Sequence, residues 1–312
     1  MNVKTIFILC IKVIALTIIL VICFIVASIL SGVTTSSTGP ETQSVDPGMV
    51  LLTLLVASLL QTTVLAYLIL RSRWSGWKLI GAVFLAFYGL NTIVAQIESV
   101  VYLPFQLPPG MVSKLFIMGA IVAALFSPVA VLILGKMRQI LTPQDPNPRL
   151  VMPTSEWLWK LTLIMIAYLM LYYTFGYFIA WKNPAVQAFY GGTDPGSFVA
   201  QLGKIWTATP WMFPFQALRA TLWTAFALPV IRMHKGQSWE TALAVALLFA
   251  VWSSQLLLPN PYMSEIVAQT HLVETASSNF IFGWLVGWLL SQHHSSLHDL
   301  LGLAKVAKSE AA

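Results

Sequence analysis

Three polar residues recur at helical spacing in the last apolar part of the chain. His271, Glu274 and Ser278 stand at positions i, i+3 and i+7, so a helix presents them on one face. An imidazole beside a carboxylate suits general acid–base catalysis by His271. A Ser278–His271 nucleophile is disfavoured, because seven residues of helix separate the two side chains by about 10 Å. The pattern therefore predicts His271 as the candidate base or acid, held by Glu274, and leaves open whether the protein is an enzyme.

The same pair is a weak metal site. His271 and Glu274 supply two ligands, whereas a catalytic zinc ion takes three from the protein. The chain has no His-Glu-x-x-His motif, and its four other histidines stand at 234, 293, 294 and 298. We therefore expect no metal and no other cofactor, and we expect the last three histidines in an exposed tail.

A second group of polar residues interrupts other apolar segments. Arg219 lies eight residues inside the segment that begins at 211, about 12 Å deep at helical rise. A charge at the bilayer centre costs roughly 2.5 to 3.5 kcal/mol, so such a residue has a partner or a function. Glu98 and Glu274 are the candidate partners. Asn91 precedes Glu98 by seven residues, which predicts a common face.

These residues define a predicted polar pocket in the outer half of the protein. Its ligand-binding candidates are Arg219, Glu98, Asn91, Gln255, Ser278 and Asn279, next to the catalytic candidates His271 and Glu274. The leading hypothesis is binding of an amphiphilic or lipid-like molecule, with positive charge from Arg219. The alternatives are an enzyme acting on an outer-leaflet substrate, and an ion-coupled transporter or subunit of a membrane complex. An Arg219 ion pair that only holds helices together is an equally strong explanation of that residue.

Composition places these residues in a membrane. Of 312 residues 58% are hydrophobic and 9% are charged, against about 25% charged in soluble domains, and the mean hydropathy is +0.79. The net charge of +6 comes from basic residues spread between apolar segments, which is the pattern of orientation signals. We therefore expect an all-α polytopic protein with the lipid bilayer, and not nucleic acid, as its partner. The oligomeric state is left open.

The apolar segments predict a single domain, residues 1–312, of eight transmembrane helices. Each segment approaches the roughly 20 residues that a bilayer core requires. They cover residues 6–30, 49–70, 79–101, 111–134, 157–181, 211–231, 239–258 and 270–290. The first is longer than the roughly 7 to 15 apolar residues of a signal peptide, which favours an uncleaved anchor. After Ser197, Phe198, Leu202 and Ile205 recur at helical spacing and predict an amphipathic helix on the outer membrane surface.

Basic residues predict the orientation. Twelve fall at one set of span ends: Lys4, Arg71, Arg73, Lys78, Lys136, Arg138, Arg149, Lys160, Arg232, Lys235, Lys305 and Lys308. Only Lys114, Lys182 and Lys204 flank the other set. Because Lys and Arg accumulate on the cytoplasmic side, we expect both termini inside, most naturally in the plasma membrane. The segment 259–279 would then face outward.

Overall fold

The structure, a computed structural model, describes residues 2–33, 46–103, 107–138, 147–194, 196–260 and 262–301. It is 80% helical, with no strand in those ranges. This confirms the prediction of an all-α polytopic membrane protein. Lys305 and Lys308 lie outside the described residues.

Six helical segments of the described chain are long and apolar enough to cross a membrane. Three are single helices, α1 (Val3–Ser31), α2 (Pro47–Leu70) and α5 (Met111–Ile133). The third segment joins α3 (Gly76–Tyr88), a π-helical stretch η2 (Gly89–Val94) and α4 (Ala95–Tyr102). The others join α6 (Thr154–Phe175) to η3 (Gly176–Ala180), and α10 (Ser238–Val251) to η4 (Trp252–Leu257). All six coincide with predicted spans.

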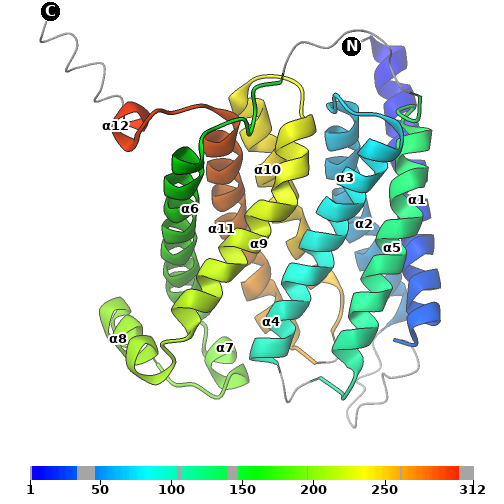
Figure 1. Ribbon diagram of the computed structural model, residues 1–312. Helices are drawn as coiled ribbons and strands as arrows, with labels where there is room; N and C mark the ends of the chain where they lie inside the picture. Colours follow the sequence, from blue (N-terminus) through cyan, green and yellow to red (C-terminus); the bar gives the residue numbers. More distant parts are fainter. Residues whose placement is uncertain are drawn as a thin grey trace, which may run out of the picture.

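Two further long helices stand where the remaining spans are predicted. They are α9 (Met212–Met233), of 22 residues, and α11 (Glu265–Ser291), of 27 residues. Both run through the same bundle as the six apolar helices (Figure 1). They carry the polar residues singled out above and are less apolar for that reason, so the total of eight spans stays a prediction.

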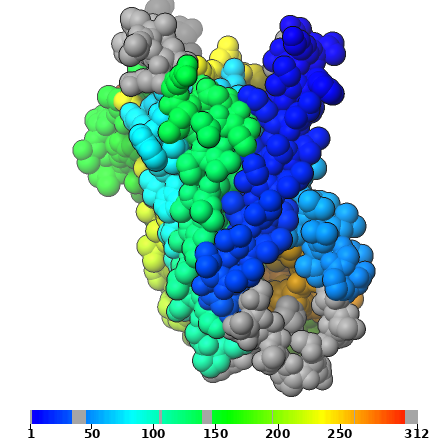
Figure 2. Space-filling model, turned by 90° about the vertical axis from the view of Figure 1, so that its right-hand side faces the viewer, coloured from blue at the N-terminus to red at the C-terminus, as the bar shows by residue number. Residues whose placement is uncertain are grey.

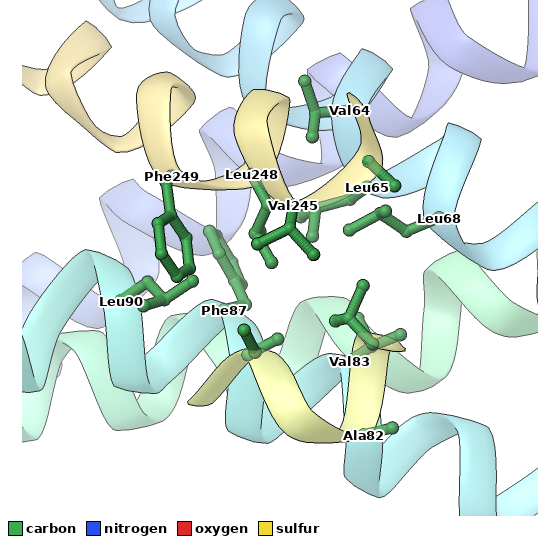
Figure 3. Packing of buried hydrophobic residues seen from close by; sticks show 14 of the residues in the cluster. Val64, Leu65, Leu68, Ala82, Val83, Phe87, Leu90, Val245, Leu248 and Phe249 are labelled. Atoms are coloured by element: carbon green, nitrogen blue, oxygen red, sulfur yellow. The ribbon is translucent and has the colours of Figure 1, made fainter. Parts of the chain in front are cut away.

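The hydrophobic core is shared by helices from both halves of the chain. Val64 and Leu65 of α2 and Phe87 of α3 meet Leu248 and Phe249 of α10 in one buried cluster (Figure 3). On the outside, α1 and α5 lie side by side along one face (Figure 2). Most isoleucines of α1, among them Ile14, Ile18 and Ile22, are exposed, as expected of side chains that face lipid.

Helices α10 and α11 approach each other through glycine. Gly283 and Gly287 stand one turn apart on α11. A Cβ at Gly283 would lie 2.7 Å from the Val245 carbonyl oxygen, and one at Gly287 would lie 2.8 Å from the Ala242 Cα. This small-xxx-small packing brings two backbones together. The Gly-x-x-x-Gly motif of residues 283–287 is present in the sequence.

One end of the bundle is basic. Figure 1 places the N-terminus, the α2–α3 turn, the end of α9 and the start of α6 at this end. Ten described basic residues belong to these ends and turns, or to the end of α5, which Lys136 joins to the α2–α3 turn by a hydrogen bond to the Ser72 carbonyl: Lys4, Arg71, Arg73, Lys78, Lys136, Arg138, Arg149, Lys160, Arg232 and Lys235. Lys114, Lys182 and Lys204 lie at the other end, with α7 (Pro184–Phe189) and α8 (Phe198–Ala208). The two ends therefore differ in charge as the sequence predicts.

The tail differs from expectation. His294 is buried between the rings of Trp159 and Trp288. Its backbone N–H donates to Glu156 Oε1 at 2.9 Å, and the same carboxylate oxygen pairs with Lys160 at 2.7 Å. The expectation of an exposed tail is therefore wrong at His294, because Glu156 and Lys160 at the start of α6 also bond to the backbone of the chain that follows α11.

His234 is a buried histidine at the basic end. Arg149 donates to the His234 backbone carbonyl, and the ring Nδ1 lies 3.2 Å from Thr241 Oγ1. Burial first, and then the positive charges of Arg149 and Arg71, lower the pKa of His234 from 6.5 to about 4. The imidazole is therefore neutral in the folded protein at physiological pH.

Acid is expected to destabilise the fold through this residue. Between pH 6.5 and about 4 the unfolded chain binds a proton at His234 that the folded chain does not, so the free energy of unfolding falls as pH falls. At 1.36 kcal/mol per pKa unit the loss reaches about 3 kcal/mol at the lower end of this window and about 2 kcal/mol at pH 5. Melting temperatures at pH 7 and pH 5 measure the second value. His234→Gln, which does not titrate, should show a smaller drop, and an equal drop would contradict the assignment.

Candidate functional site

Arg219 of α9 is paired with Glu98 of α4. Its Nη2 lies 2.6 Å from Glu98 Oε1, with the Arg219 side chain 3% exposed and that of Glu98 26% exposed. Arg219 Nη1 donates to Gln216 Oε1 at 2.8 Å, and Gln216 Nε2 donates to Tyr102 Oη at 2.6 Å. The pair is therefore part of a hydrogen-bonded network and not an isolated contact.

Tyrosine rings of α6 close this network on one side. The Arg219 guanidinium carbon lies 5.8 Å from the Tyr168 ring centroid and 6.0 Å from that of Tyr172, within cation–π range. The Tyr172 hydroxyl lies 3.1 Å from that of Tyr102. The sequence alone explains these tyrosines by packing; the structure adds that they surround a charge.

His271 and Glu274 of α11 form a second pair. His271 Nδ1 lies 2.7 Å from Glu274 Oε2, with side-chain exposures of 17% and 12%. The other ring nitrogen, Nε2, lies 3.3 Å from the hydroxyl of Tyr190, which follows α7. With the Nδ1 proton donated to the carboxylate, Nε2 is the acceptor and Tyr190 is the donor. Burial, with the charges of Glu98 and Glu274, raises the pKa of Tyr190, so this hydroxyl keeps its proton.

The two pairs belong to one polar cluster, defined by Glu98, Arg219, His271, Glu274 and Tyr190. Glu98 interacts electrostatically with His271 and Glu274 as well as with Arg219. Tyr190 in turn interacts with both carboxylates. The structure thus brings together four predicted site residues, Glu98, Arg219, His271 and Glu274, from α4, α9 and α11.

Asn91 and Gln255 lie elsewhere. Gln255 Nε2 donates to Asn91 Oδ1 at 3.1 Å and to the Asn91 backbone oxygen at 3.2 Å. Both line a separate cavity of ≈ 60 Å³, together with Phe24, Thr92 and Gln96. Asn91 and Glu98 therefore face different neighbours, contrary to the expected common face. The π-helical stretch η2, which contains Asn91 and ends before Glu98, has an extra residue in its turn. The residues that follow it therefore point to a different side of the helix.

The two remaining predicted residues, Ser278 and Asn279, belong to α11. The Ser278 hydroxyl donates to the Glu274 backbone oxygen at 2.7 Å, a bond local to the helix, and Asn279 is buried. The distance argument against a Ser278 nucleophile is consistent with this local bond.

Helix α8 lies at the same end of the bundle as the polar cluster. The Ser197 side chain accepts a hydrogen bond from Ala200 N at 3.2 Å and so caps the start of α8. Phe198 packs on Phe178 and Tyr177, whereas Val199 and Trp206 are exposed. An exposed tryptophan on a surface helix is typical of the membrane interface.

Tyr190 belongs to the site but is not predicted from the sequence. It lies in an irregular segment with no periodic pattern, so only the fold could place it beside His271. Comparison of the chain with protein-family models, with curated proteins and with solved structures finds no match.

Proposed function

We propose that this multi-pass membrane protein binds a lipid-like amphiphilic molecule, with its polar head in the polar cluster. The observation that carries the proposal is the meeting of four ionisable side chains from three helices, three of them partly exposed. Ionisable groups inside membrane proteins mark functional sites by default. The apolar part of such a ligand would lie in the surrounding lipid, next to the exposed apolar residues of α8.

Within this proposal the partly exposed groups contact the ligand, and Arg219 holds them in place. Arg219 is almost fully buried, and its Nη groups are engaged by Glu98 and Gln216, so these two groups fix Glu98. His271 and Glu274 are held in a fixed orientation by their mutual contact. Such mutual support of side chains is what a preorganised site requires.

Native mass spectrometry of the gently solubilised protein tests the proposal. The wild type is expected to retain an amphiphile that Arg219→Met loses, because Glu98 is then no longer held. Arg138→Gln, which alters an exposed charge at the basic end, is the control and should keep the ligand. The same bound species in Arg219→Met and in the wild type would contradict the proposal.

Catalysis is the second candidate. It is favoured by two contacts of His271, one with the Tyr190 hydroxyl and one with the Glu274 carboxylate. A carboxylate holds one ring nitrogen, and the other faces a hydroxyl, which is the arrangement of a general base. In the same experiment, His271→Asn should accumulate a substrate that the wild type converts. Equal amounts of one species in both proteins would favour binding without reaction.

We also infer that the basic end faces the cytoplasm, with both termini inside and the protein in the plasma membrane. The support is the ten-to-three distribution of described basic residues between the two ends. In a chain with Cys10 and Cys23 replaced by serine, a membrane-impermeant maleimide added to intact cells should label Lys204→Cys and spare Arg138→Cys. The reverse pattern would invert the orientation.

A further inference from the structure

The carboxylates of the polar cluster favour a cationic ligand. Glu98 and Glu274 supply two carboxylates, against the single guanidinium of Arg219. Arg219 is already paired with Glu98. An anionic head group, the natural expectation for Arg219 taken alone, would therefore meet two carboxylates and a guanidinium that is already engaged.

Each carboxylate has one oxygen left for a ligand. Glu98 uses Oε1 for Arg219 and Glu274 uses Oε2 for His271. No group in the described chain donates to Glu98 Oε2 or Glu274 Oε1. The two carboxylates also repel each other, a cost that a shared positive charge would relieve.

A buried donor remains beside them. The Nε of Arg219, a side chain only 3% exposed, meets no acceptor among the described residues. A buried donor without an acceptor costs free energy, so it favours a ligand that brings an oxygen. The remaining hydrogen-bonding capacity is thus two carboxylate acceptors and one guanidinium donor.

We propose that the head group is an amino alcohol, with its ammonium between Glu98 and Glu274 and its oxygen accepting from Arg219 Nε. This inference rests on the proposed function and names the ligand class of the same site. The sequence alone, through Arg219, suggests a negatively charged head group, whereas the proposed head group is positively charged.

Three probes with the same alkyl chain test the inference on the full-length protein in neutral maltoside micelles. They are N-dodecylethanolamine, dodecyl phosphate and 1,2-dodecanediol, titrated while binding is followed by native mass spectrometry. N-Dodecylethanolamine is expected to bind at least about tenfold more tightly than the other two. This factor corresponds to the free energy of one charge-assisted hydrogen bond. Glu274→Gln should remove about that factor. Glu265→Gln, at the exposed start of the same helix, should not.

The outcomes separate this inference from the proposed function. Tighter binding of dodecyl phosphate, lost in Arg219→Met, would overturn the amine assignment and keep an amphiphile site. Equal binding of all three probes, still sensitive to Arg219→Met, would overturn it as well and leave a site selective for the alkyl chain. Binding of no probe would count against the proposed function itself.

Discussion

Arg219→Met is expected to lower the free energy of unfolding by about 3 kcal/mol, the lower end of the range for breaking a buried ion pair. The substitution keeps the volume of the side chain but leaves the Glu98 carboxylate without its partner. Because Glu98 is 26% exposed, solvent and lipid head groups compensate part of the loss. Thermal unfolding in detergent micelles measures it.

The double variant distinguishes a structural pair from a functional one. Adding Glu98→Gln to Arg219→Met removes the unpaired charge, so most of the lost stability should return. Ligand binding should not return, since the Glu98 carboxylate that contacts the head group is gone. If the double variant recovers binding as well, the pair serves only to hold helices together. If it is no more stable than Arg219→Met, the unpaired charge is not the source of the loss.

Gly283→Ala and Gly287→Ala together are expected to lower the free energy of unfolding by about as much as Arg219→Met does. The cause here is packing alone. Each new methyl group would lie within 3 Å of α10 backbone atoms, and backbone cannot rotate away as a side chain can. Overpacking of this kind costs about 1 to 3 kcal/mol per site. With both glycines replaced, α10 and α11 should separate, and the protein should fail to elute as a single folded species in size-exclusion chromatography.

Gly81→Ala is the matched control for these variants. Gly81 lies in a helix of the same bundle, and a Cβ there would meet no atom within 4 Å. Its stability should stay at or slightly above that of the wild type, because alanine favours the helix. A similar loss in all three variants would show that the α10–α11 contact is not responsible, because Gly81 makes no such contact.

The sequence predicts the helices of this fold better than their faces. Long apolar segments identify the spans, because the bilayer demands both length and apolarity. The orientation of Asn91 relative to Glu98 is predicted wrongly. The π-helical stretch η2 interrupts the regular helical repeat, and no residue pattern in the sequence predicts such a stretch. Arg219 and Glu98 are anticipated as partners because buried charges seek opposite charges. Tyr190 could not be anticipated, because a residue in an irregular loop has no periodicity to interpret.

The shared core limits how this protein can move. Transporters that rock one half of the chain against the other need two bodies, each with its own core. Here Leu248 and Phe249, from the second half, are packed among residues of α2 and α3 (Figure 3), and the Arg219–Glu98 pair also joins the two halves. Rigid-body rocking would expose that core and break that pair. A ligand of the proposed site would therefore have to reach the partly exposed Glu98, His271 and Glu274 side chains while the two halves stay packed together.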